Sequence, residues 1–158
     1  FNIFSIEIRE HKISQKTLGK PSEKLLCYSI YMIAHTSLPV SDYKKAKDFY
    51  IKALAPLGYK QTMEYGEAAG FEEGGHTSFW IATNEKGVVP MHVAFEAKNR
   101  EAVEEFYKVA LASGARDNGA PGYRKEYWPG YYAAFVFDND GHNIEAVWYD
   151  YSQVEEKK

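Results

Sequence analysis

Two histidines and one glutamate stand where they could bind a metal ion together. His35, His92 and Glu145 each lie in a stretch where polar and apolar residues alternate, which is typical of a β-strand with one polar face. Imidazole nitrogens and carboxylate oxygens are ligands that divalent metals accept, and three of them leave coordination positions open for substrate and water. The sequence therefore predicts one divalent ion at these residues, and it does not distinguish Fe, Mn, Zn and Ni.

The two histidines occupy equivalent positions in an internal repeat. The spacing from the histidine to a Phe-Tyr pair is the same in both copies, from His35 to Tyr50 and from His92 to Tyr107. A unit of about 57 residues is too small to bury a stable core alone, so we expect the two copies to pack into one domain. A single strand histidine is usually only a hydrogen-bonded side chain, but its recurrence in register favours metal binding.

Each copy predicts the order strand, helix and three strands. In the first copy, residues 33–83, the expected elements lie at residues 33–40, 43–54, 60–65, 68–71 and 78–83. In the second copy, residues 91–149, a strand at 91–97 precedes a helix that is capped by Asn99 and ended by Gly114. Residues 118–122 then form a loop, followed by strands at 123–127, 133–137 and 143–149. The fold class is therefore α+β, with two tandem βαβββ modules that form a curved mixed sheet around a cleft.

The sheet face that the helix leaves uncovered is free to line this cleft. On the last strand, alternation turns Ile144 and Ala146 toward the helix and Glu145 toward the cleft. The same alternation on the last strand of the first copy turns Trp80 toward the cleft.

Aromatic residues make up 16% of the chain, and a group of them precedes the last two strands. These residues either pack a large curved sheet or form the wall of a cleft for an apolar or planar ligand. We expect Tyr127, Trp128 and Tyr132 to contact substrate together with Trp80. Arg124 could hold a substrate carboxylate or phosphate through its fork of N–H donors, although a loop arginine is more often solvated.

These features resemble the vicinal-oxygen-chelate superfamily, which includes glyoxalase I, extradiol dioxygenases, and fosfomycin- and bleomycin-resistance proteins. The residues that carry the resemblance are Ala34-His35-Thr36-Ser37-Leu38, Phe49-Tyr50, Leu57-Gly58-Tyr59, Phe79-Trp80-Ile81, His92-Val93-Ala94-Phe95, Asp117-Asn118-Gly119-Ala120-Pro121-Gly122 and Asp140-Gly141-His142-Asn143-Ile144-Glu145-Ala146. The resemblance implies paired βαβββ modules and matches the family's metal ligands to His35, His92 and Glu145. Trp80 stands where glyoxalase I has a fourth ligand, which indicates a three-ligand site without glyoxalase I activity.

The resemblance implies a divalent-metal-dependent enzyme that acts on a small oxygenated organic substrate as a lyase, isomerase or dioxygenase. The alternative is a metal-free protein that binds or sequesters a small molecule, in the manner of the bleomycin-binding members. The metal content of the protein distinguishes the metal-dependent enzyme from the metal-free binding protein. The resemblance also allows the cleft to form either within one chain or between the two chains of a homodimer.

The charge of the chain excludes some partners. A net charge of −3 and an isoelectric point near 6.0 provide no basic stripe for nucleic acid or an anionic membrane, and no apolar run is long enough to span a bilayer. We therefore expect a soluble, cytoplasmic protein. The only cysteine, Cys27, cannot form an internal disulfide, and the turn residues His76 and His142 are expected to be solvated.

The ends of the chain lie outside the repeat. Residues 1–31 carry no clear hydrophobic period, so we expect them to be an N-terminal extension or leader. A single domain should then occupy residues 32–151, followed by a charged tail at residues 152–158.

Overall fold

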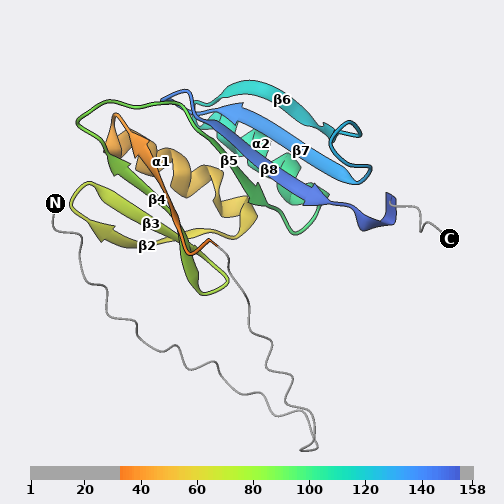
Figure 1. Cartoon of the computed structure of the whole chain (residues 1–158), viewed down its shortest axis with the longest axis horizontal. Helices are drawn as coiled ribbons and strands as arrows, with labels where there is room; N and C mark the ends of the chain where they lie inside the picture. Colours follow the sequence, from red (N-terminus) through yellow and green to blue (C-terminus); the bar gives the residue numbers. More distant parts are fainter. Residues whose placement is uncertain (1–32, 154–158) are drawn as a thin grey trace, which may run out of the picture. The chain divides into compact units, whose positions relative to one another are not determined.

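The computed structural model describes residues 33–153, which form two modules of the same topology (Figure 1). The first module contains β1 (Thr36–Val40), α1 (Tyr43–Ala53), the short 3-10 helix η1 (Ala55–Leu57), β2 (Lys60–Tyr65), β3 (Ala68–Glu73) and β4 (His76–Thr83). The second contains β5 (His92–Glu96), α2 (Arg100–Ala112), β6 (Arg116–Tyr123), β7 (Tyr131–Phe137), β8 (Asn143–Tyr149) and the 3-10 helix η2 (Tyr151–Gln153). The expected extension at residues 1–31 and the tail from residue 154 onward lie outside the described residues.

Each module forms a four-stranded mixed sheet. The strand order is β1-β4-β3-β2 in the first, which we call sheet A, and β5-β8-β7-β6 in the second, which we call sheet B. In both sheets the first strand pairs parallel with the last, and the other neighbours are antiparallel. The identical order confirms the α+β class and the two tandem βαβββ modules.

Both helices begin at capping side chains and lie against their own sheets in Figure 1. The Asp42 carboxylate accepts a hydrogen bond from the backbone N–H of Lys45 at 3.0 Å, and the Asn99 side chain accepts one from Ala102 at 2.9 Å. Gly114 follows α2 with a φ of 100°, a left-handed conformation that favours glycine. Within residues 33–153, no helix has the length and apolar character needed to span a lipid bilayer.

The helix-covered faces of the two sheets share one hydrophobic core. Ile81 from sheet A and Ile144 from sheet B are both fully buried in it. Phe79 of β4 and Phe95 of β5 meet edge to face, with ring centroids 5.0 Å apart. Because these faces are used for packing, the opposite face of each sheet, which we call its outer face, is the one that can meet a ligand.

The structure corrects the second module between α2 and β7. Residues 118–122 were expected to form a loop, and residues 123–127 a strand, but β6 covers Arg116–Tyr123 and the connection to β7 follows it. Two register shifts interrupt the pairing of β6 with β7, next to Gly119. An edge strand with bulges tolerates the glycines and the proline that made this segment look like a loop.

Candidate functional site

The outer face of sheet B carries a group of hydrogen-bonded polar side chains. Glu145 on β8 lies opposite Phe135 on β7 and Ala94 on β5, and His92 lies opposite Asn143. These side chains face away from α2 because strand residues alternate between the two faces of a sheet. The outward direction of Glu145 that the alternation predicts is thus confirmed by the burial of both its neighbours in the core.

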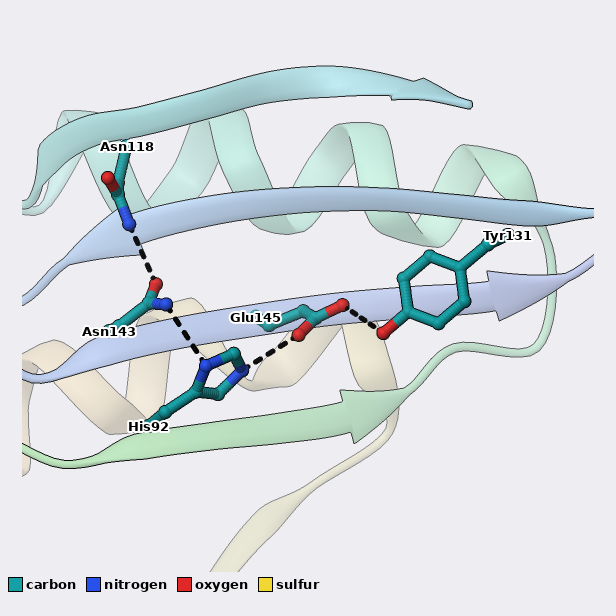
Figure 2. Close-up of polar contacts among 5 residues, drawn as sticks. All are labelled: His92, Asn118, Tyr131, Asn143 and Glu145. Carbon is teal, nitrogen blue, oxygen red and sulfur yellow. Dashed lines mark hydrogen bonds and ion pairs between the residues drawn. The ribbon is translucent and has the colours of Figure 1, made fainter. Parts of the chain in front are cut away.

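Glu145 is the centre of this group. Only 2% of the residue is exposed, and both carboxylate oxygens have partners (Figure 2). His92 Nε2 lies 2.8 Å from Oε2, and the Tyr131 hydroxyl donates to Oε1 across 2.5 Å. A buried carboxylate without such partners would be costly, so these two contacts fix its position as well as stabilising it.

Two asparagines extend the group on the other side of the imidazole. Asn143 Nδ2 lies 3.2 Å from His92 Nδ1, and Asn118 Nδ2 donates to Asn143 Oδ1 at 2.9 Å (Figure 2). With this arrangement Nδ1 accepts and Nε2 carries the hydrogen that it gives to Glu145. Rotating the side-chain amides of Asn143 and Asn118 by 180° exchanges their donor and acceptor atoms. The asparagine pair can therefore form hydrogen bonds with either tautomer of His92.

Tyr131 keeps its proton over a wider pH range than an ordinary tyrosine. Partial burial raises the pKa of its hydroxyl above the usual value, and the hydrogen bond to the Glu145 carboxylate is the second largest cause of this increase. Tyr131 therefore acts as a hydrogen-bond donor, and Glu145 acts as the acceptor.

The His92–Glu145 pair fits two neighbouring positions around a metal ion. Two ligand atoms that bind one ion at about 2.1 Å, at the right angle of neighbouring octahedral positions, lie about 3 Å apart. The separation of 2.8 Å between His92 Nε2 and Glu145 Oε2 is close to this value. Asn143 is placed to hold the second nitrogen of the imidazole, as outer partners of metal-binding histidines do.

His35 does not join this pair within one chain. It is exposed and directly precedes β1 in sheet A, because the first strand begins at Thr36 instead of residue 33. Within residues 33–153, the one trio of histidine, cysteine or acidic residues whose ligand atoms lie within 4.8 Å of one another does not include it. A three-residue metal site with His35 therefore stays a prediction that needs a second chain.

The trio that does lie close together is formed by Asp138, Asp140 and His142 in the turn between β7 and β8. His142 was expected to be solvated, but it is fully buried. Its Nδ1 accepts a hydrogen bond from Met91 N–H at 3.0 Å, and its Nε2 lies 2.8 Å from the carbonyl oxygen of Pro39. Since both ring nitrogens are engaged, His142 has no free lone pair for a metal.

The carboxylates of this trio also bond to the protein. Asp138 accepts hydrogen bonds from the Tyr50 hydroxyl at 2.6 Å and from the His142 N–H at 2.8 Å, and Asp140 accepts two from Ser41. The trio thus ties the last turn of the second module to β1 and α1 of the first. The buried part of the trio is structural, and the sequence analysis did not predict it.

Arg124 follows β6 and lies on the outer face of sheet B. Its guanidinium carbon is 5.5 Å from the centre of the Phe135 ring, and Nη2 donates to the carbonyl oxygen of Ala120 at 2.7 Å. The same phenyl ring meets the His92 imidazole edge to face, with ring centroids 6.4 Å apart. Phe135, which the sequence analysis did not single out, therefore joins Arg124 to the His92–Glu145 pair.

Aromatic side chains continue the outer face beyond Tyr131. Tyr131 meets Tyr149 and Tyr127 edge to face, each at 5.4 Å between ring centroids. Trp128 in turn meets Tyr149 at 5.8 Å. The structure thus places two of the predicted substrate contacts, Tyr127 and Trp128, in one aromatic group next to Glu145.

Tyr132 lies on the opposite face, which corrects its expected place in the cleft. It is 3% exposed, belongs to the core, and donates a hydrogen bond to Glu104 of α2 at 2.8 Å. The reason is the start of β7 at Tyr131, which extends the strand by two residues and makes Tyr131 the one that shares a face with Phe135.

Trp80 lies on the outer face of sheet A, as the alternation predicts. Its neighbours Phe79 and Ile81 are buried in the core, whereas Trp80 is partly exposed and stacks on Tyr65 with ring centroids 6.3 Å apart. The indole lies over Gly70, where a Cβ atom would be only 2.9 Å from the ring. Sheet A thus presents an aromatic outer face of its own.

Comparison with known proteins agrees with this architecture. The family model described as the Glyoxalase/Bleomycin resistance protein/Dioxygenase superfamily matches residues 32–146. A glyoxalase/bleomycin resistance protein from Albidiferax ferrireducens T118 is 24% identical, with a TM-score of 0.66 over 76% of this chain and 100% of its own. A glyoxalase/bleomycin resistance protein/dioxygenase family enzyme from Burkholderia phytofirmans PsJN is 16% identical, with a TM-score of 0.60 over 75% of this chain and 98% of its own.

TioX from Micromonospora sp. ML1 has the same fold, with 17% identity and a TM-score of 0.57 over 73% of this chain and 96% of its own. Identities this low establish a shared fold and no more. Among curated proteins, none matches the chain significantly.

Proposed function

Because the chain belongs to the glyoxalase/bleomycin resistance protein/dioxygenase superfamily, we propose that it is a divalent-metal-dependent enzyme that acts on a small oxygenated organic molecule. The observation that carries this proposal is the His92–Glu145 pair, whose ligand atoms are spaced for one ion and lie on an outer face between an arginine and an aromatic group. The reaction would be that of a lyase, an isomerase or a dioxygenase.

The third ligand in this proposal is His35 from a second copy of the chain. Within one chain His35 lies directly before the first strand of sheet A and apart from the His92–Glu145 pair, so the proposed site requires a homodimer that sets sheet A of one copy against sheet B of the other. Symmetric dimers are the commonest homo-oligomers, and such an arrangement would create two identical sites. It would also cover the aromatic outer face of sheet A around Trp80 and Tyr65.

When bound, the ion would polarise adjacent oxygen atoms of the substrate and stabilise negative charge on them. The chain's own residues prepare the site for this. Tyr131 holds Glu145 in place as a protonated donor, and Asn143 orients the imidazole of His92. Tyr127, Trp128 and Phe135 provide apolar surface that would exclude water from the reacting atoms.

Metal content tests the proposal directly. Protein purified without a chelator should contain about one divalent ion per chain by elemental analysis, and His92→Ala and Glu145→Gln should each lower this well below one. Asp140→Asn is the matched control, because Asp140 belongs to the other acidic trio, and it should keep the metal. Loss of metal in Asp140→Asn with retention in His92→Ala would overturn the assignment.

A metal-free binding protein is the second candidate. It is favoured by one observation, that His92, Glu145 and Tyr131 satisfy one another's hydrogen bonds without an ion. Protein that contains no metal after chelator-free purification, and that takes up none when titrated with Fe²⁺, Mn²⁺, Zn²⁺ or Ni²⁺, would favour this candidate. In either case the resemblance puts Trp80 where glyoxalase I has a fourth ligand, so we expect no turnover of the methylglyoxal–glutathione adduct.

A further inference from the structure

The guanidinium group of Arg124 lies over two glycine positions of β6, and a backbone hydrogen bond and a phenyl ring orient it. A Cβ atom on Gly122 would lie 2.9 Å from Arg124 Nη1, and one on Gly119 would lie 3.4 Å from Nη2 and 3.1 Å from the Phe135 ring. Two positions without side chains therefore make room for the guanidinium group on the surface of β6. The hydrogen bond to the carbonyl oxygen of Ala120 and the Phe135 ring complete this recess.

The charge held in this recess has no acidic partner. Among residues 33–153, no carboxylate oxygen lies within ion-pair distance of Arg124, whereas Arg100 on α2 pairs with Glu104 at 2.8 Å. A guanidinium group has five N–H donors, and the described part of the chain uses one of them here. An arginine that a hydrogen bond and a phenyl ring orient, but whose charge is not compensated, is complementary to an oxyanion.

The recess opens on the same face as the candidate metal ligands. Phe135 contacts Arg124 and His92, and it lies opposite Glu145 in the pairing of β7 with β8. A molecule that placed its reacting oxygens at His92 and Glu145 could therefore reach Arg124 by passing over a single phenyl ring. The group that arrives at Arg124 should carry negative charge.

We propose that Arg124, in the recess formed by Gly119, Gly122 and Phe135, binds a carboxylate or phosphate group of the substrate, so that the substrate is an anionic oxygenated molecule. This inference rests on the proposed function for what occurs at His92 and Glu145, but the anion subsite itself is independent of the metal. The planar fork of the guanidinium group would bind two oxygens of the anion at once.

Small anions test the subsite without knowledge of the substrate. Acetate, inorganic phosphate and methylphosphonate would be titrated into the purified full-length protein at constant ionic strength, and binding would be followed through the side-chain N–H signal of Arg124 by NMR. At least one of these anions should saturate this signal. Tighter binding of acetate would indicate a carboxylate substrate, and tighter binding of phosphate or methylphosphonate would indicate a phosphate or phosphonate substrate.

Arg124→Gln and Arg116→Gln form a matched pair of variants. Arg116 is the first residue of β6, the strand that Arg124 follows, and lies over another phenyl ring, Phe137 at 5.3 Å, but it is exposed and has no glycine recess. The tighter anion, followed by calorimetry, should bind about tenfold or more weakly to Arg124→Gln and unchanged to Arg116→Gln. Arg124→Lys, which keeps the charge but loses the fork, should give an intermediate affinity.

The results separate this inference from the proposed function. Equal binding by wild type and Arg124→Gln, or an equal loss in both glutamine variants, would overturn the subsite. The metal content of Arg124→Gln should equal that of the wild type, since Arg124 is not a ligand. Anion binding by Arg124 in a protein that takes up no metal would support the subsite while contradicting the proposed enzyme.

Discussion

The Tyr131 hydroxyl donates a hydrogen bond to Glu145 across 2.5 Å, from the strand next to the one that carries the glutamate. The carboxylate is buried, and its other oxygen faces His92 at 2.8 Å. One tyrosine thus determines which oxygen of Glu145 is left for an ion or a ligand. This relationship makes Tyr131 a positioning residue for the proposed site.

Removing the hydroxyl should loosen Glu145. We expect Tyr131→Phe to bind the divalent ion about 10–100-fold more weakly, because partners that orient metal ligands have effects of this size. Competition with a metal indicator would measure this. Tyr127→Phe is the control, since Tyr127 lies in the same aromatic group but is 63% exposed. Equal metal affinity in wild type and Tyr131→Phe would show that Tyr131 does not position the carboxylate.

The raised pKa of Tyr131 also predicts a dependence of stability on pH. In the unfolded chain a tyrosine loses its proton near pH 10, whereas in the folded chain its pKa is higher. The unfolded state then binds fewer protons above pH 10, so the stability from this group is present below that pH and lost as the pH rises toward the folded pKa. Denaturant unfolding at pH 9 and at pH 11 would measure this. Between these two pH values the free energy of unfolding should decrease less in Tyr131→Phe than in wild type. The same decrease in both would contradict the assignment.

His142 should be required for the attachment of the two modules to each other. His142→Ala removes contacts with Pro39 and Met91 and leaves a cavity, so we expect a loss of about 2–4 kcal/mol in the free energy of unfolding. Asp140→Asn, at an exposed hydrogen bond, should cost less than about 1 kcal/mol. Urea unfolding would measure the free energy of unfolding of both variants and of wild type. Equal stabilities, or a loss of metal from folded His142→Ala, would contradict the structural role.

The alternation of residues was enough to orient the strands that the sequence located correctly. It placed Trp80 and Glu145 on outer faces and their neighbours in the core. It was not applied to Tyr132, because the start of β7 was placed two residues too late and Tyr132 was left in the aromatic group before the strand. Once the strand begins at Tyr131, the same rule puts Tyr132 against α2.

The parts that could not be predicted depend on contacts distant in sequence. The burial of His142 is set by the main chain of Pro39 and Met91, which no local pattern reveals. The bulges that let β6 include Gly119 arise from its pairing with β7. Similarly, the repeat spacing predicted equivalent positions for His35 and His92. It could not predict the distance between them, because this distance depends on how the two modules and two chains pack.

Residues 1–31 are expected to be dispensable, because the described modules are complete without them. A chain that starts at Met32 should have an unfolding midpoint within about 10 °C of that of the full chain. A larger decrease in the midpoint would imply a loss of more than about 2 kcal/mol in the free energy of unfolding. Thermal unfolding followed by circular dichroism would measure this. A decrease of more than about 10 °C would place the start of the domain before Met32.

Gly70 should be needed for the position of Trp80. In Gly70→Ala the new methyl group would lie 2.9 Å from the indole and 2.8 Å from Thr77, so the ring must move away from β3. We expect a loss of about 1–3 kcal/mol in stability and a change in tryptophan fluorescence. In a Trp80→Phe background the same alanine should leave the fluorescence unchanged. A change that persists in that background would mean that another tryptophan reports it.

Mixed dimers test whether the site forms between two chains. His35→Ala and His92→Ala should each bind little metal alone. If His35 of one copy meets His92 and Glu145 of the other, a dimer with one chain of each variant has one site that carries both substitutions and one that carries neither. Equal mixing after reversible unfolding should then restore metal at about a quarter of all sites. A site within one chain would give no recovery, because every chain would lack one ligand. The mass of the assembly in solution is the control, since a protein that stays monomeric excludes the intermolecular site whatever its metal content.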